Sequence, residues 1–450
     1  MRIIPVLLFL LCTASLSAAD YYVDSLNGSD AADGRSPQTA WKSTDRINTA
    51  DLKPGDKVLF RRGGLWRGHI SCRAGSESAP IYYGTYGEGR APVLLGSVSL
   101  TDPDSWLPPS DPEQKIWVTR PGLFSSENVG NIILTPKGKL PADPNRLYLD
   151  DTARKAAWKR WSQDELKSQD DYFFDYNTNQ IFYYSGKNPA DLYDEIEAAP
   201  NGAMISAASF VTIEHLSLGF CGGHGIAGSP AEGVTIRDCT LFWIGGSELR
   251  SYPSPHVRYG NGIEFWDHGK NHTVEGCRFR EIYDTAMTIQ GPSPSIYQNI
   301  VWRNNTVDRS EQSFEIWLSH PDSEIHNMVF EGNICRNAGF GWGHEQRPNK
   351  NGTHLLGYQL KSKVLDVTIR GNLFSRGRDG LVMYWNSRLG ELNINENRWE
   401  QPEAGGIPGI EQPLFIWGIG SAEEHKVPYE EYRALTGNDA DSEFFYPPCF

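Results

Sequence analysis

A pattern of alternating apolar and polar residues recurs seven times between Val211 and Trp399. Each copy is mostly apolar at its first, third and last positions; the copies are Val211–Leu218, Val234–Leu241, His272–Phe279, Ile300–Val307, Met328–Cys335, Val367–Phe374 and Leu392–Trp399. Their starts lie 23, 38, 28, 28, 39 and 25 residues apart. Period-two alternation predicts a β-strand, and a repeat of this length predicts one coil of a parallel β-solenoid. Because one coil cannot bury its apolar face alone, we expect the coils to stack. A β-sandwich with coincidental spacing is the alternative.

The sixth position of the repeat predicts an inward bend. It is occupied in turn by Leu216, Cys239, Cys277, Asn305, Asn333, Asn372 and Asn397. Stacked Asn side chains can hydrogen-bond to one another along the axis of the solenoid. The two cysteines would be neighbours in adjacent coils, and we expect buried free thiols there, with a disulfide as the alternative.

A second apolar segment follows the bend in six coils: Ile263–Trp266, Met287–Gln290, Phe314–Trp317, Tyr358–Lys361, Val382–Trp385 and Leu414–Trp417. Successive side chains of a strand point to opposite faces, so the first and third residues should face the core. One outward row then holds Glu264, Thr288, Glu315, Gln359, Met383 and Phe415. The other holds Trp266, Gln290, Trp317, Lys361, Trp385 and Trp417. Since aligned exposed tryptophans mark an interaction surface, we expect a groove for a polysaccharide, unless long insertions or the C-terminal tail cover them.

Two carboxylates in the first outward row predict the chemistry. Glu264 and Glu315 lie two coils apart, roughly 9.6 Å at the usual strand spacing. Inverting glycosidases separate their carboxyl groups by about 6.5–9.5 Å, so we expect an acid/base pair. Thr288 lies between them and could orient water, and Asp284 is a third candidate acid. The alternatives are Ca²⁺ binding by these carboxylates or ion pairs with Arg258 and Lys361.

Two long coils carry polar loops next to the expected groove. One contains His344 and Arg347 and continues to His354, and the other contains Arg258 and Tyr259. Histidine and arginine over a groove suit acid/base work or carboxylate binding, although structural hydrogen bonding explains such loops equally well. The candidate catalytic residues are therefore Glu264, Glu315, Asp284, His344, Arg347 and Lys361. The candidate substrate-binding residues are Trp266, Thr288, Gln290, Trp317, Gln359, Trp385, Tyr259 and His354.

The rest of the 450-residue chain predicts an exported protein. Residues 1–19 have a basic start, a short apolar run and small residues at their end, as in a signal peptide, so we expect secretion or export to a periplasm and no membrane span. We expect an N-terminal cap with the first coils over 20–103, an inserted β-rich region over 104–198, the β-helix with its groove over 199–420 and a tail over 421–450. The insertion should contain a helical piece from Ala153 to Ser168 and a hairpin around residues 172–184, and the tail a helix near 428–435.

Charge and cysteine usage limit the partners. A net charge of −14 argues against nucleic acid. No Cys-x-x-Cys pair occurs, so the usual zinc and haem motifs are absent from the sequence. With 14 tryptophans in an acidic chain, we expect a carbohydrate partner, no cofactor and a monomer.

The segments 21–43, 52–68 and 79–94 resemble the opening part of secreted right-handed parallel β-helix proteins of the pectate-lyase-like superfamily. The resemblance implies an all-β, right-handed parallel β-helix and action on carbohydrate, but no particular reaction. We favour a glycoside hydrolase because the outward row is rich in carboxylates. A polysaccharide lyase or C5-epimerase is the alternative. Glu264, Asp284 and Glu315 would then hold Ca²⁺, and the base would be Lys361, Arg347, His344 or Tyr259. A non-catalytic sugar-binding solenoid is the second alternative.

Overall fold

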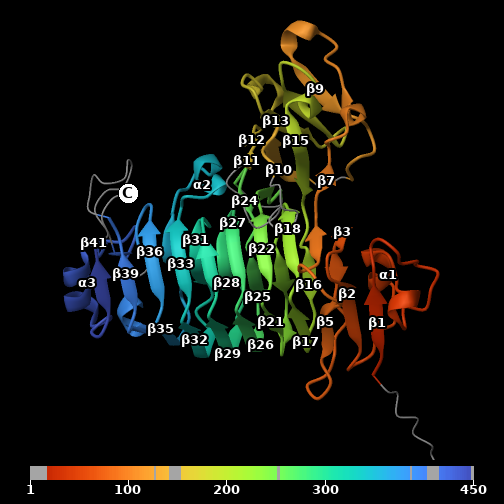
Figure 1. Cartoon of the computed structure of the whole chain (residues 1–450). Helices are drawn as coiled ribbons and strands as arrows, with labels where there is room; N and C mark the ends of the chain where they lie inside the picture. The colour runs from red at the N-terminus through yellow and green to blue at the C-terminus, as the bar shows by residue number, and fades with distance from the viewer. Residues whose placement is uncertain are drawn as a thin grey trace, which may run out of the picture.

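Three long parallel sheets form the body of the protein in a computed structural model (Figure 1). The structure describes residues 18–125, 128–140, 154–250, 254–385, 388–402 and 415–446. Nearly all of the expected signal peptide therefore lies outside the described residues. Consecutive strands pass from sheet I to sheet II to sheet III and back, which makes one coil.

The sheets are built from short strands. Sheet I contains β1 (Asp20–Val23), β2 (Lys57–Arg61), β5 (Ile81–Tyr86), β17 (Val211–Glu214), β20 (Ala231–Glu232), β21 (Thr235–Arg237), β26 (Gly269–Glu275), β29 (Ile296–Arg303), β32 (Glu324–Glu331), β35 (Val364–Arg370) and β38 (Asn393–Asn395). Sheet II contains β3 (Leu65–Arg67), β6 (Val93–Leu95), β18 (Ser217–Cys221), β22 (Thr240–Ile244), β27 (Arg278–Ile282), β30 (Thr306–Asp308), β33 (Ile334–Ala338), β36 (Leu373–Gly377), β39 (Arg398–Glu400) and β42 (Glu443–Phe445). Sheet III contains β4 (Ile70–Ser71), β16 (Ile205–Ala207), β19 (Ile226–Gly228), β25 (Ile263–Trp266), β28 (Thr285–Gly291), β31 (Gln312–Leu318), β34 (Thr353–Gly357), β37 (Val382–Tyr384), β40 (Phe415–Trp417) and β41 (His425–Val427).

The predicted asparagine ladder is present at the bend between sheets I and II. The Nδ2 of Asn305 donates to the Oδ1 of Asn333, Asn333 donates to Asn372, and Asn372 donates to Asn397, each over 3.0 Å. Each of these Oδ1 atoms also accepts the backbone N–H of the preceding Asn in the ladder. The expectation of an inward bend is confirmed. Polar asparagine side chains can occupy this buried position because the ladder gives each amide a hydrogen-bond partner.

Replacing Asn333 with Leu is expected to lower the free energy of unfolding by about 1–3 kcal/mol, because the ladder partners on both sides lose hydrogen bonds in a dry interior. Denaturant unfolding followed by circular dichroism measures this. Asn393→Leu is the control, since Asn393 is exposed on the outer face of the adjacent sheet. Equal losses in both variants would mean that the ladder adds nothing beyond ordinary strand packing.

The inserted region forms two small sheets that project from the β-helix near its N-terminal half (Figure 1). Their strands are β7 (Val98–Ser99), β8 (Trp106–Leu107), β9 (Ile116–Thr119), β10 (Val129–Pro136), β11 (Lys155–Ala156), β12 (Trp158–Lys159), β13 (Asp171–Asp175), β14 (Gln180–Tyr184) and β15 (Tyr193–Pro200). The expected hairpin is confirmed, with Tyr172 opposite Tyr183. The helix expected from Ala153 to Ser168 is wrong. Its described residues form β11, β12 and one short 3-10 turn, because Lys155 and Arg160 pair with Asp170 and Asp171 across strands.

Helices are few and short. They are α1 (Thr44–Asn48), α2 (Trp342–Gln346) and α3 (Tyr429–Thr436), and the last confirms the helix expected in the tail. Tyr432 of α3 stacks on Phe415 at 4.2 Å between ring centroids and so covers the C-terminal end of the core. In the part of the chain that the structure describes, no helix has the length and apolar composition that crossing a lipid bilayer requires.

The register of sheet III differs from the expected alignment in two coils. Phe314 pairs with Leu355 rather than with Tyr358, and Val382 pairs with Phe415 rather than with Leu414, which lies outside the described residues. Phe415 and Trp417 therefore face the core and not the groove. In β34 the reason is that the strand follows a long excursion of the chain, and the position at which it resumes depends on the length of that excursion.

The five cysteines that the structure describes are free thiols: Cys72, Cys221, Cys239, Cys277 and Cys335. Cys239 and Cys277 are both buried in the core, and burial holds the pKa of the Cys277 thiol well above its usual range. The expectation of free thiols in adjacent coils is thus confirmed.

Candidate active site

Three side chains that point outward from sheet III form the floor of the candidate site. Glu264 of β25 pairs with Thr288 of β28, which pairs in turn with Glu315 of β31. The two carboxylates are each only 6% exposed, and Thr288 is fully buried between them. The predicted row of Glu264, Thr288 and Glu315 therefore exists, with Thr288 as its packed centre rather than as an exposed contact.

Glu315 is held by donors from its neighbours. Its Oε2 accepts from the Nε2 of Gln290 at 2.7 Å and from the Oγ1 of Thr285 at 3.1 Å. Thr288 donates its hydroxyl to the backbone oxygen of Glu315 at 3.1 Å. Burial, together with the negative charges of Asp284 and Glu264, raises the pKa of Glu315 to about 8. The carboxyl group is therefore protonated at neutral pH and can give up a proton.

This raised pKa predicts how stability depends on pH. Because the folded pKa of about 8 exceeds the ordinary value of 4.5, the folded protein binds a proton that the unfolded chain lacks between these two pH values. The protonated carboxyl group of Glu315 therefore makes its full contribution to the free energy of unfolding below pH 4.5, and this contribution is lost as the pH rises toward about 8.

We therefore expect Glu315→Gln, which cannot titrate, to gain stability relative to the unaltered protein as the pH is raised through this window. The slope should approach about 1.4 kcal/mol per pH unit. Denaturant unfolding at a series of pH values measures it. A constant difference between the two proteins from pH 5 to 8 would contradict the raised pKa.

Glu264 lies at the other end of the floor. Its Oε2 accepts from the Nδ2 of Asn261 at 2.7 Å, and its Oε1 lies 3.4 Å from the Nε2 of His224. The ring of His224 lies 5.0 Å from that of Tyr259, whose hydroxyl donates to Asn201. Tyr259 thus reaches the site through His224.

Asp284 faces the floor from the bend between sheets II and III. It is partly exposed, and the Nη1 of Arg347 lies 3.1 Å from its Oδ1. Arg347 also lies 3.8 Å from the buried Glu311, which is 3.1 Å from the Nδ1 of His344. Burial works against ionisation of Glu311, yet Arg347 and His344 hold its pKa below the usual value. Arg347 is thereby fixed between two carboxylates, with one of them directed at the groove.

His344 contributes to this network from a dry position. Its side chain is only 2% exposed, and it contacts Glu311. His344 therefore orients Glu311, whereas the sequence had predicted direct contact with a substrate. Glu311, His344 and Asp379 bring ligand atoms within 4.8 Å of one another, which is a possible set for a metal ion. The guanidinium group of Arg347 lies 3.8 Å from Glu311, and the Nδ1 of His344 lies 3.8 Å from Asp379. A positive charge thus already faces Glu311.

An aromatic row lies beside the carboxylates on the outer face of sheet III. The ring centroids of Trp266 and Trp317 are 5.5 Å apart, those of Trp317 and Tyr358 6.3 Å, and those of Tyr358 and Trp385 5.1 Å. Each ring is partly exposed. The structure therefore places the three expected tryptophans in one row, with Tyr358 in the position that the sequence alignment gave to Lys361.

Two of the expected site residues, His354 and Lys361, lie elsewhere, and Gln359 borders the aromatic row. His354 is fully buried, bonded to Ser313 at 2.9 Å, and burial lowers its pKa to about 3. It is a neutral core residue and cannot bind a substrate. Lys361 is exposed in the loop after β34, so it does not belong to the outward row. Gln359 is exposed and meets the edge of Trp317 at 3.5 Å.

The sequence argument missed four residues of the site: His224, Asn261, Glu311 and Tyr358. Three of them lie at or next to bends and not in the aligned segments. A signal was available for His224, which lies one coil before Glu264 in a glycine-rich turn, and for Glu311, which stands four residues before Glu315 in the same coil.

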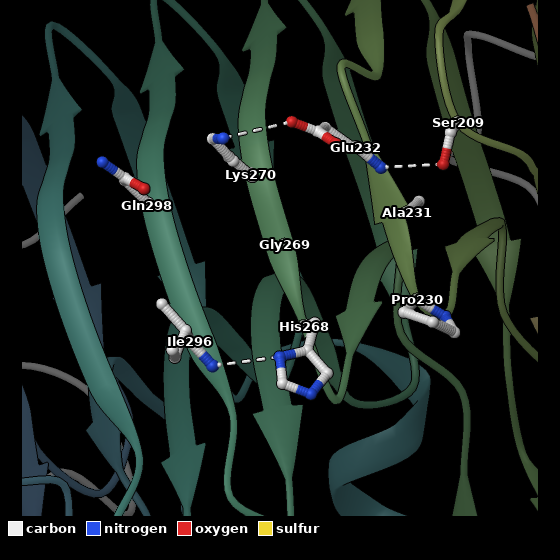
Figure 2. A pocket seen from close by; sticks show the side chains of 9 residues that line it. All are labelled: Ser209, Pro230, Ala231, Glu232, His268, Gly269, Lys270, Ile296 and Gln298. Atoms are coloured by element: carbon white, nitrogen blue, oxygen red, sulfur yellow. Dashed lines mark hydrogen bonds and ion pairs between the residues drawn. The ribbon is translucent and has the colours of Figure 1, made fainter.

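A hollow of about 360 Å³ on the outer face of sheet I is not the active site (Figure 2). Its carboxylate, Glu232, faces Lys270 in an ion pair of 3.4 Å. The Nδ1 of His268 accepts the backbone N–H of Ile296. No aromatic side chain other than His268 and no second carboxylate lines this hollow, so it has neither an acid/base pair nor a stacking surface.

Comparison with known proteins identifies the fold. Residues 195–408 match the family model described as "Right handed beta helix region". The chain has the fold of a right-handed β-helix. The structure of XylC in complex with xylose has the same fold, with a TM-score of 0.51 at 9% identity, over 88% of this chain and 71% of that one.

Two further relatives carry the name lacto-N-biosidase. That of Bifidobacterium longum subsp. longum is 40% identical over 93 residues, which are 19% of this chain and 6% of the relative. The GH136 lacto-N-biosidase of Eubacterium ramulus has a TM-score of 0.41 at 13% identity, over 95% of this chain and 68% of that one. This chain thus matches only a small part of the curated relative.

Proposed function

We propose that the protein is a glycoside hydrolase whose general acid is Glu315. The observation that carries this proposal is the position of Glu315: a buried carboxyl group that feels the charges of Asp284 and Glu264, next to a row of partly exposed aromatic rings. Pairs of acidic groups whose surroundings separate their pKa values are typical of acid/base assignments in glycosidases.

Each carboxylate has a role in the proposed reaction. Glu315 donates its proton to the glycosidic oxygen, which leaves as a hydroxyl group when the bond to the anomeric carbon breaks. Asp284, paired with Arg347 and partly exposed, removes a proton from the water that attacks the anomeric carbon. Glu264, held by Asn261 and His224, lies at the end of the floor, where its charge helps to raise the pKa of Glu315.

The aromatic row supplies substrate binding. Trp317→Ala is expected to raise KM about tenfold, since a ring that stacks on a sugar loses its apolar contact. The melting temperature should stay nearly unchanged, because the ring is partly exposed on the outer face of β31. Steady-state kinetics and thermal unfolding measure both effects. A large fall in melting temperature with an unchanged KM would show that Trp317 is a packing residue.

The lacto-N-biosidase of Bifidobacterium longum supports a hydrolase, whereas the lyase alternative loses one of its four candidate bases, since Lys361 is outside the outward row. The deciding experiment incubates the protein with a panel of oligosaccharides, including uronate polymers. New reducing ends without the ultraviolet absorbance of an unsaturated uronate indicate hydrolysis. Both signals together indicate a lyase and overturn the proposal.

A further inference from the structure

A second cavity of about 370 Å³ lies between the inserted sheets and the β-helix. One wall comes from β12, β13 and the turn that follows β13. The other comes from the excursion that carries β23 (Ser247–Glu248) and β24 (Arg258–Tyr259). None of its lining residues belongs to the catalytic network described above, so its chemistry is not explained by the proposed hydrolysis.

Aromatic rings line this cavity and are fixed by polar partners. Trp161 stacks on His256, with ring centroids 4.1 Å apart and planes 25° from parallel. The guanidinium group of Arg250 lies 3.9 Å above the ring of Tyr176. These contacts join the inserted region to the excursion of the β-helix, so the rings are held before any ligand binds.

Hydrogen-bonding groups lie beside these rings. Glu248 accepts the hydroxyl of Tyr176 at 2.7 Å and lies 3.2 Å from the Nδ1 of His256. A carboxylate has about four acceptor positions, so these two partners leave capacity for further donors. The carboxylate of Asp175 lies in the same lining and is bonded to the backbone of its own turn.

We propose that this cavity binds one neutral sugar unit, separately from the groove where cleavage occurs. Aromatic faces suit the C–H faces of a pyranose ring, and carboxylates accept its hydroxyl hydrogens. The lining carries charges of both signs, with Lys159, Arg160 and Arg250 beside Asp175 and Glu248. This mixed polar lining suits a neutral ligand rich in hydroxyl groups and disfavours a lipid chain. Strand β24 passes from this cavity to the active site, since Tyr259 contacts His224, the partner of Glu264. Sugar bound here would keep a carbohydrate chain near the groove.

The test uses the full-length protein carrying Trp317→Ala, a change that should weaken sugar binding at the aromatic row. The four probes are D-galactose, D-glucose, D-xylose and N-acetyl-D-glucosamine. Saturation-transfer NMR measures their binding. We expect at least one sugar to bind, and the further change Trp161→Ala to weaken it about tenfold. The matched control is Trp158→Ala, because Trp158 lies on the same segment, is 40% exposed and does not line the cavity.

Two results would overturn the inference. One is that none of the four sugars binds, and the other is that Trp158→Ala and Trp161→Ala weaken binding equally. Circular dichroism verifies that both variants fold. Failure of the protein to hydrolyse any substrate would leave this measurement unaffected, so the two proposals can fail independently.

Discussion

Glu315→Gln is expected to lower kcat by about 10²–10⁴-fold, the usual contribution of a general acid. Glutamine keeps the shape and can still bond to Thr285 and Gln290, but it has no proton to donate to the leaving oxygen. Substrate binding should therefore persist, and it can be measured by calorimetry with the inactive variant. Glu232→Gln is the matched control, because it makes the same change in the hollow on sheet I (Figure 2).

The same residue should set the alkaline limit of activity. In the protein with Glu315 intact, kcat/KM should fall as the pH rises through about 8, where the carboxyl group loses its proton. If Glu315→Gln keeps near-normal turnover in buffer with a chelator, Glu315 is not the acid. If it loses activity and excess Ca²⁺ restores it, Glu315 is a metal ligand and the lyase mechanism replaces the proposed one.

The fold could be predicted because it depends on repetition. Seven copies of one strand pattern determine the bend and the stacking of coils, and the four copies with asparagine at the sixth position determine the ladder. The alternation of side chains also placed Glu264, Glu315 and the tryptophans of the regular coils on the outer face correctly.

The site could be predicted only where the coils are regular. In β34, the pattern of apolar residues allowed two registers, and Leu355 rather than Tyr358 pairs with Phe314. A shift of three residues moves every side chain to a new row, which is why Lys361 was assigned to the groove and His354 was not assigned to the core. Arg347 and His224, which contact Asp284 and Glu264, come from other coils. Their proximity arises from the stacking of coils, which the alternation within one strand does not show.

The identity of the second carboxylate can be determined by comparing Asp284→Asn with Glu264→Gln. We expect Asp284→Asn to lower kcat by about 10²–10⁴-fold, since it removes the base that activates water. It should also move the alkaline limit of kcat/KM to lower pH. The reason is that, after burial, the negative charge of Asp284 raises the pKa of Glu315 more than the charge of Glu264 does.

Glu264→Gln should accordingly cost less turnover and move the alkaline limit less. Full pH–rate profiles of both variants against the same oligosaccharide measure the two effects together. The opposite order, with the larger loss and the larger shift in Glu264→Gln, would make Glu264 the partner of Glu315. That pair lies two coils apart on sheet III, a separation that favours inversion at the anomeric carbon. The anomer released first should then have the configuration opposite to that of the substrate.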